Sequence, residues 1–260
     1  MKKRLLAILL CLLVLATTSC EQKRDQVKKM KKQLLIYCGI TMIKPMMEIK
    51  AVIEKEYNCE ILITKGGSGN LLKSLKMNKI GDLYLPGSDS YIKKCKEEKL
   101  VSETAFVGYN KAAIMVAKGN PKKISSDLNN LKSKKYTVVI GNPESGSIGK
   151  ETKKILTKKK IFDEVISNSA ILTTDSKKLF QVLKNNEADL VINWYAVSTW
   201  KEQRDFVTAI EIDEKYASKN KLVIGLLKYS KHPEIAKEFM KYAKSSAGKA
   251  IFNKYGLGDM

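Results

Sequence analysis

The sequence has 260 residues, with 48 Lys and Arg against 27 Asp and Glu, and its formal net charge is +21. This charge attracts anions, but only Arg4, Arg24 and Arg204 are arginines, the side chain whose planar fork reads phosphate and guanine, so we expect no nucleic-acid partner. The only histidine is His232 and the cysteines show no metal-ligand spacing, so we predict that the chain is not an enzyme and holds no metal and no cofactor.

The N-terminal segment has the order of a secretory signal. Basic residues 2–4 precede an apolar stretch at residues 5–16, and small residues lead to Cys20. The apolar stretch is shorter than the roughly 20 residues that cross a bilayer as a helix, so residues 1–19 are predicted to be a cleaved signal peptide. The segment resembles the lipobox of bacterial lipoproteins, which implies a lipid anchor at Cys20. An ordinary cleaved signal is the alternative, and the charged residues 20–32 are typical of a tether.

From residue 33 onward, short apolar runs alternate with amphipathic stretches. Strands are predicted at residues 33–38, 59–64 and 82–85, followed by helices at residues 43–57, 70–77 and 89–98. A second set has strands at residues 112–117, 136–140 and 189–193 and helices at residues 148–159 and 176–185. The last section has a strand at residues 222–227 and helices at residues 233–245 and 247–255. This alternation is typical of an α/β fold with parallel sheets.

Two α/β sets without a Pro/Gly-rich linker between them predict two lobes joined by strand-like crossovers. We expect lobe I to comprise residues 33–110 plus 208–260 and lobe II residues 111–207, with hinges near Lys111 and Thr208. The remaining cysteines, Cys38, Cys59 and Cys95, are odd in number, and we expect them to be small buried residues without a disulfide framework.

Four predicted strand-to-helix turns are rich in hydroxyl groups and glycine. They are Gly39-Ile40-Thr41, Gly66-Gly67-Ser68-Gly69, Ser145-Gly146-Ser147 and Thr173-Thr174-Asp175-Ser176. Each turn places hydroxyls and free backbone N–H groups at the positive end of a helix dipole, where anions bind. Any one of these turns, taken singly, is better explained as an ordinary helix cap. Because strand carboxyl ends in open α/β sheets face one crevice, the four together favour an anion site.

Five segments of the chain occur in the order and spacing of a known family. They are LLIYCGITMIKPMMEIKAVIEKE, GGSGNLLKSLKMNKIGDLYL, NKAAIMVAKGNP, GNPESGSIGKETKKIL and NEADLVINWYA. In these segments the chain resembles the periplasmic molybdate-binding proteins of the ModA type, over roughly residues 33–256. The resemblance implies a type II periplasmic-binding-protein fold, in which two α/β lobes joined by crossover strands hold an oxyanion in the cleft between them without a metal.

The resemblance also implies site residues, position by position. In this sequence they are Thr41, Ser68, Gly69, Gly146, Ser147 and Ser176. The family's ligand-contacting tyrosine falls at Trp194 by spacing and at Tyr195 by identity. The turn at residues 85–89 is one residue longer here than in the family, and the first hydroxyl is the threonine Thr41.

The resulting hypothesis is an extracytoplasmic solute-binding protein of an ABC importer. It would bind a tetrahedral oxyanion, with molybdate or tungstate as the leading ligand, and deliver it as a monomer to a permease of the inner membrane. We expect it in the periplasm or on the extracytoplasmic face of the cytoplasmic membrane, held there through Cys20. One alternative is the same fold with sulfate, thiosulfate, phosphate or a small organic anion. The other is a basic envelope lipoprotein without a small-molecule ligand.

Overall fold

The computed structural model describes residues 31–258. The predicted signal peptide, Cys20 and the tether up to residue 30 lie outside the described residues. Strand β1 begins at Lys32, the last residue of the predicted tether. In the described part of the chain, no helix is both long enough and apolar enough to span a membrane.

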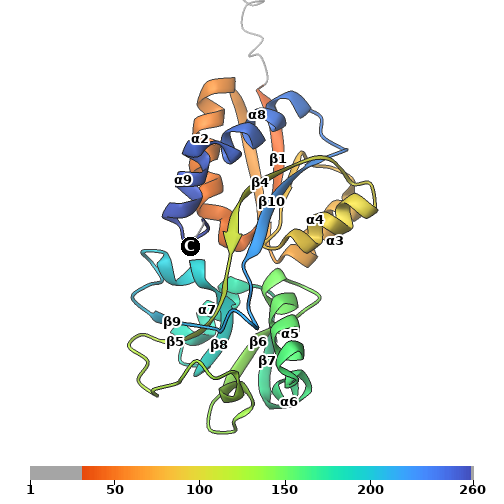
Figure 1. Cartoon of the computed structure of the whole chain (residues 1–260). Coiled ribbons are helices and arrows are strands. Elements are labelled where there is room, and N and C mark those ends of the chain that lie inside the picture. Colours follow the sequence, from red (N-terminus) through yellow and green to blue (C-terminus); the bar gives the residue numbers. More distant parts are fainter. Residues whose placement is uncertain (1–30, 259–260) are drawn as a thin grey trace, which may run out of the picture. The chain divides into compact units, whose positions relative to one another are not determined.

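The first sheet has the strand order β2-β1-β3-β10-β4. Its strands are β1 (Lys32–Gly39), β2 (Cys59–Gly66), β3 (Leu83–Leu85), β4 (Val101–Asn110) and β10 (Asn220–Leu227). Helices α2 (Ile43–Tyr57), α8 (Pro233–Lys244) and α9 (Ser246–Lys254) cover one face, and α3 (Ser68–Asn78) and α4 (Asp89–Glu97) cover the other (Figure 1). The short 3-10 helix η1 (Ile40–Met42) joins β1 to α2.

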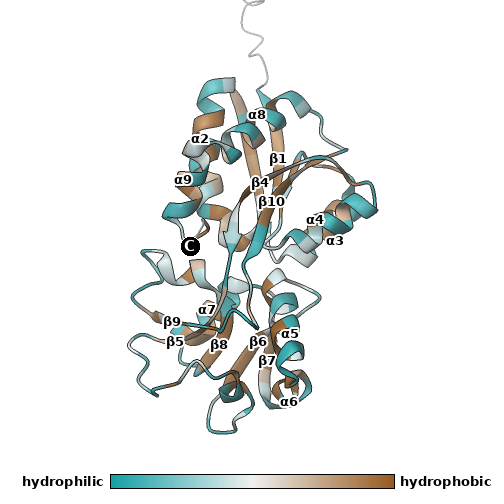
Figure 2. Ribbon diagram, in the orientation of Figure 1, coloured by the Kyte–Doolittle hydropathy of each residue, from teal (hydrophilic) through white to brown (hydrophobic). Residues whose placement is uncertain are grey.

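Strand β1 shows why this sheet is covered on both faces. Leu34, Ile36 and Cys38 pack into the core with α2, α8 and α9. Tyr37 packs into the separate core beneath α3 and α4. Successive side chains of a strand point to opposite faces, so a continuous apolar run such as β1 needs cover on both sides. Figure 2 shows the same division, with apolar strands and helices that turn hydrophilic residues outward.

The second sheet has the strand order β7-β6-β8-β5-β9 and one core. Its strands are β5 (Ala112–Ala117), β6 (Val138–Gly141), β7 (Ser169–Thr173), β8 (Leu190–Trp194) and β9 (Val207–Glu211). The helices of this lobe are α5 (Ser147–Lys159), α6 (Phe162–Asn168), α7 (Ser176–Lys184) and the 3-10 helices η2 (Leu128–Lys132) and η3 (Tyr195–Thr199).

The sheets are mixed, so the prediction of parallel sheets is right for only some of the strand pairs. β1 and β3 are parallel, as are β6 and its neighbours β7 and β8. In contrast, β10 runs antiparallel to β3 and β4, and β5 runs antiparallel to β8 and β9. An apolar run indicates burial but carries no information on strand direction. The two α/β lobes joined by crossovers are confirmed.

The chain passes between the two lobes at two crossovers. β4 leads into β5 through Lys111, the position expected for the first hinge. β9 pairs with β5 in the second sheet, and residues 212–219 then lead to β10 in the first sheet. The second crossover therefore follows Glu211 and does not lie at Thr208. The pairing of β9 with β5 is what assigns β9 to the second sheet.

Candidate ligand-binding site

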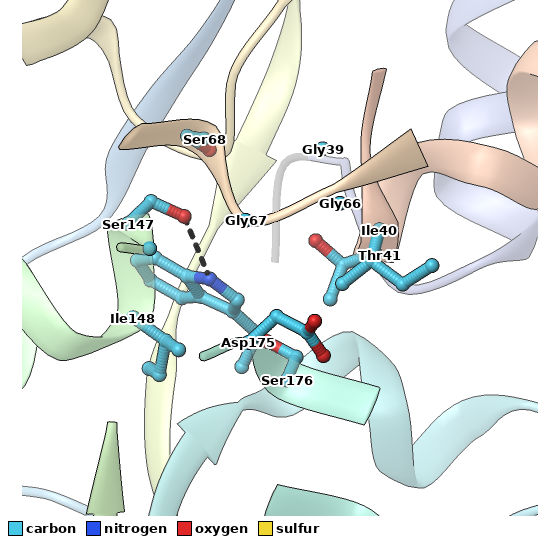
Figure 3. A pocket seen from close by; sticks show the side chains of 12 residues that line it. Gly39, Ile40, Thr41, Gly66, Gly67, Ser68, Ser147, Ile148, Asp175 and Ser176 are labelled. Atoms are coloured by element: carbon cyan, nitrogen blue, oxygen red, sulfur yellow. Dashed lines mark hydrogen bonds between the residues drawn. The ribbon is translucent and has the colours of Figure 1, made fainter. Parts of the chain in front are cut away.

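A small cavity lies at the carboxyl ends of strands from both sheets. It is lined by Gly39, Ile40, Thr41, Gly66, Gly67, Ser68, Gly146, Ser147, Ile148, Asp175, Ser176 and Trp194. Thr41 follows β1, Ser68 begins α3 after β2, Ser147 begins α5, and Ser176 begins α7 after β7. Trp194 is the last residue of β8. Both lobes therefore contribute to one site (Figure 3).

The cavity is compact. The cavity volume is about 10 Å³. This volume corresponds to roughly one water molecule, whereas sites for drug-sized molecules measure roughly 300–1,000 Å³. With the lobes in this arrangement, the cavity is therefore far smaller than a site for a large organic ligand.

The hydroxyls of Ser68 and Ser147 are buried, and each accepts a hydrogen bond from an N–H group. Ser68 Oγ accepts from the Gly87 amide at 3.0 Å, and the Ser68 carbonyl accepts from the Tyr84 hydroxyl at 2.7 Å. Ser147 Oγ accepts from Trp194 Nε1 at 3.3 Å, the bond drawn in Figure 3. Thr41 Oγ1 lies 3.1 Å from the sulfur of Met42, a weak acceptor.

Two of the helices that point at the cavity begin without a side-chain cap. Gly67 is the N-cap of α3 and Gly146 is the N-cap of α5, and a glycine has no side chain to accept from the first-turn amides. The first four N–H groups of a helix have no partner within it. The starts of α3 and α5 therefore offer backbone donors and the positive end of a dipole to a ligand.

Helix α7 differs because the carboxylate of Asp175 caps its first amides. Asp175 Oδ1 accepts from the amides of Lys177 and Lys178 at 2.9 and 3.1 Å. The carboxylate of Asp175 lines the cavity, but it serves as the N-cap of α7. The lining contains no lysine, arginine or histidine, so the favourable field for an anion comes from backbone amides and hydroxyls.

The side chain of Tyr84 is hydrogen-bonded to the first residue of α3. It is fully buried, and burial raises the pKa of its phenol well above the ordinary value. The neutral hydroxyl is a donor over the physiological range, and it donates to the Ser68 carbonyl. This bond fixes the backbone on which the Ser68 hydroxyl is carried.

The lobes touch directly around the cavity. The Asn70 amide of α3 donates to the Ser145 carbonyl at 3.1 Å. A Cβ atom on Gly67 would lie 2.4 Å from the Ser145 oxygen, and one on Gly69 would lie 2.3 Å from the Glu144 oxygen. Only glycine allows the backbones to approach this closely.

Side chains link the lobes at two further places. Lys150 of α5 lies over the ring of Tyr91 in α4, 5.2 Å from its centroid. Lys44 of α2 pairs with Glu202 and lies over the ring of Trp200, at 5.1 Å. The structure therefore represents the lobes in contact on both sides of the cavity.

Most of the predicted site residues meet in this cavity. Thr41, Ser68, Gly146, Ser147, Ser176 and Trp194 line it. Gly69 is not among the lining residues and instead abuts Glu144. Tyr195 is not among them either, because it begins η3 and its amide donates to the Lys111 carbonyl. The sequence left open whether Trp194 or Tyr195 corresponds to the family's ligand-contacting tyrosine. Of the two, only Trp194 lines the cavity.

Sequence reasoning missed Gly87 as a neighbour of the site. A Cβ atom on Gly87 would lie 2.3 Å from Ser147 Oγ and 3.5 Å from Trp194 Nε1. Gly87 lies in the turn that is one residue longer than in the resembled family, and that extra length was the available signal. Its contact with Ser147 joins different lobes and has no trace in the local pattern.

Within residues 31–258 no group of three or more His, Cys, Asp or Glu side chains is arranged to hold a metal ion. His232 is the N-cap residue of α8 and does not line the cavity. In the described part of the chain, Cys38, Cys59 and Cys95 are buried and form no disulfide, which confirms their expected burial, and burial raises the pKa of the Cys38 thiol.

The sequence is similar to that of a known protein over most of its length. YvgL of Bacillus subtilis, whose name provisionally assigns it to the substrate-binding lipoproteins of ABC transporters, is 25% identical over 253 residues, which cover 95% of this chain and 93% of YvgL.

Solved structures with the same fold bind different solutes. The periplasmic molybdate-binding protein of Azotobacter vinelandii superposes with a TM-score of 0.76 at 12% identity, covering 87% of this chain and 99% of that one. The sulfate-binding protein SubI of Mycobacterium tuberculosis gives 0.77 at 12% identity over 87% and 86%. A periplasmic thiamin-binding protein gives 0.74 at 17% identity over 90% and 86%. At these identities the likeness shows the fold alone.

Residues 34–258 match the family described as bacterial extracellular solute-binding protein. The match spans both sheets, the crossovers and the cavity between the lobes. The chain is therefore a member of the bacterial extracellular solute-binding proteins.

Proposed function

We propose that this protein binds a small tetrahedral oxyanion between its two lobes, with molybdate or tungstate as the leading ligand. The observation that carries the proposal is the donor set of the cavity. Buried hydroxyls of Ser68 and Ser147 meet the uncapped starts of α3 and α5 in a space too small for a large organic ligand. Neutral donors can hold a dianion when several hydrogen bonds and helix ends converge on it.

Selectivity would follow from size and from polarity. A lining without lysine or arginine holds no fixed cation that would favour any anion by charge alone. Close contacts of glycines with backbone from the other lobe limit how far the cavity can expand while the lobes remain in contact. The resemblance to the molybdate-binding proteins supports molybdate and tungstate over the other oxyanions.

Solute-binding proteins of ABC transporters deliver their ligand to a membrane permease, and we propose that role here. The lobes would open and close about the crossovers at Lys111 and residues 212–219. A ligand that bridges Ser68 of lobe I and Ser147 of lobe II would favour the closed form. The lipid anchor at Cys20 would hold the protein, as a monomer, at the extracytoplasmic face of the cytoplasmic membrane.

The test is calorimetric titration of the chain without residues 1–19 with molybdate, tungstate, sulfate, thiosulfate and phosphate. We expect one ligand per chain and tightest binding of molybdate or tungstate. Preference for sulfate, thiosulfate or phosphate would keep the oxyanion site and replace its leading ligand. Binding of none of the five would overturn the proposal.

Ionic strength separates a cavity from a charged surface. Binding of anions to surface lysines weakens steeply with salt because exposed charges are screened. Binding in a desolvated cavity weakens modestly, so we expect the dissociation constant to change little between 50 and 500 mM NaCl. A steep salt dependence would instead indicate that the lysine-rich surface of a basic envelope protein captures the anion.

A further inference from the structure

Trp194 is placed as a fixed donor behind the cavity. Its side chain is 1% exposed, and its backbone ends β8 in register with Ala112 of β5. An indole has one N–H and no acceptor. That N–H points at Ser147 Oγ, 3.3 Å away (Figure 3). In this bond Ser147 can only be the acceptor.

The bond from Trp194 affects whether the Ser147 hydroxyl donates to a ligand or accepts from it. A serine hydroxyl has one hydrogen to donate and two lone pairs. The indole occupies one lone pair, and no hydrogen bond among residues 31–258 uses the Ser147 hydroxyl as a donor. Its hydrogen is therefore available to a ligand in the cavity that Ser147 lines. An oxyanion oxygen is an acceptor, so this polarity suits it.

The same arrangement occurs at the second serine. The Gly87 amide donates to Ser68 Oγ at 3.0 Å, and within the described residues Ser68 also has no acceptor for its hydroxyl hydrogen. Gly87 abuts Ser147 from the other lobe, since an added Cβ would lie 2.3 Å from Ser147 Oγ. In each lobe, therefore, an N–H group donates to a serine hydroxyl: Gly87 to Ser68 in lobe I and Trp194 to Ser147 in lobe II. The two pairs lie next to each other in the cavity lining.

We propose that Trp194 is a positioning residue that sets Ser147 as a hydrogen-bond donor, with the Gly87 amide doing the same for Ser68. Trp194 acts on the ligand through Ser147, where a tyrosine would have offered its own hydroxyl. The wall then favours oxyanions whose facing oxygens carry no hydrogen over those that present an O–H to it. The effect on affinity rests on the proposed oxyanion function, whereas the Trp194–Ser147 bond does not.

The chain provides its own control for this proposal. Trp200 is also buried, but its indole N–H has no hydrogen-bond partner among the described residues. Trp194→Phe should weaken molybdate binding about tenfold, because the Ser147 hydroxyl is no longer oriented. Trp200→Phe keeps an aromatic ring beneath Lys44, so it should leave binding unchanged. Adding Ser147→Ala to Trp194→Phe should cost nothing beyond Ser147→Ala alone, because the two residues act as one unit.

Ligand selectivity separates positioning from a general packing effect. Without the indole, both lone pairs of Ser147 Oγ are free and the hydroxyl can rotate to accept from a protonated ligand, so Trp194→Phe should weaken hydrogen phosphate less than sulfate or molybdate. An equal loss for all three anions would overturn the proposal and leave Trp194 as a packing residue. A loss of binding in Trp200→Phe equal to that in Trp194→Phe would do the same.

A measurement without ligand tests the bond even if no oxyanion binds. In nitrogen-15 NMR spectra the protein has two tryptophan indole N–H signals, and Trp200→Phe assigns them. Ser147→Ala should shift the Trp194 signal upfield and speed its exchange with water, while the Trp200 signal stays in place. An unmoved Trp194 signal would overturn the proposal in a variant that keeps the fold. If the signal moves but no oxyanion binds to the unsubstituted protein, the proposed function fails while the bond stands.

Discussion

Helices α3, α4, α5 and α7 each begin after a strand and its turn, and they fall into two pairs. Helices α4 and α7 are capped by their own side chains, Ser88 and Asp175. Helices α3 and α5 begin at glycines and have no side-chain cap. The difference shows that a hydroxyl-rich turn offers free backbone donors only where no side chain caps the helix. Capped turns consume the donors that a ligand would need.

The largest expected effect comes from preventing α3 from reaching the other lobe. In Gly69→Ala, the new Cβ would lie 2.3 Å from the Glu144 carbonyl oxygen, which is backbone and cannot turn away. We expect a strain of about 3 kcal/mol in the closed form, or roughly a hundredfold loss of oxyanion affinity. Titration calorimetry measures the loss.

Gly66→Ala is the matched control in the same turn. Its nearest neighbour would be a Leu71 side-chain carbon at 3.7 Å, an ordinary contact. Because Gly66 itself lines the cavity, its methyl group can take up some ligand space, but without an overlap with backbone the loss of affinity should be much smaller than in Gly69→Ala. Equal losses in the two alanine variants would mean that the close approach of α3 to Glu144 is not what matters.

The next effect concerns the Ser68 hydroxyl at the uncapped start of α3. Ser68→Ala removes a charge-assisted hydrogen bond worth roughly 1.5–3 kcal/mol, so affinity should fall tenfold or more. Ser74→Ala on the same helix should have no effect, because Ser74 contacts Asn78 and does not line the cavity. Unchanged affinity in Ser68→Ala would remove Ser68 from the site.

A smaller effect, of opposite sign, is expected at the capped helix α7. Asp175→Asn keeps a good N-cap residue but removes a carboxylate from the cavity lining. Affinity for a dianion should rise several-fold, and the unfolding midpoint should change little. A loss of binding would show that the Asp175 carboxylate holds the ligand and that α7 belongs with α3 and α5.

The smallest effect lies in the packing beneath the capped helix α4. Burial raises the pKa of Tyr91 from 10.0 to about 12 and that of Cys95 from 9.0 to about 12. Between pH 9 and 12 the unfolded chain releases protons that the folded chain keeps, so stability is full below pH 9 and falls as pH rises. Urea unfolding at pH 8 to 11 measures the fall. The double variant Tyr91→Phe, Cys95→Ala should show a shallower fall, and an identical one would contradict the assignment.

Local patterns predicted the elements that carry the site but not their pairing. The bounds of α2 and β5 agree with the prediction because their apolar residues recur at the period of a helix or fill a buried strand. β7 was missed because it is an edge strand whose Ile171 and Leu172 are about half exposed. β9 was missed because its partner β5 lies some ninety residues earlier, which no local window contains.

For the site, the turns indicated Thr41, Ser68 and Ser147 because free amides and hydroxyls are local features. The choice between Trp194 and Tyr195 required the end of β8, where the chain leaves the sheet and turns Tyr195 into η3. The role of Gly87 required the other lobe. Contacts between lobes are set by tertiary packing, and the sequence around each residue does not contain them.

The most direct test of the two uncapped helices as the anion site is a crystal structure of the protein with tungstate, in which anomalous scattering locates the tungsten atom. We expect a single tungsten in the cavity, within hydrogen-bonding distance, through its oxygens, of the Ser68 and Ser147 hydroxyls and of the first amides of α3 and α5. Tungsten bound only at surface lysines, or only at the starts of α4 and α7, would contradict the account.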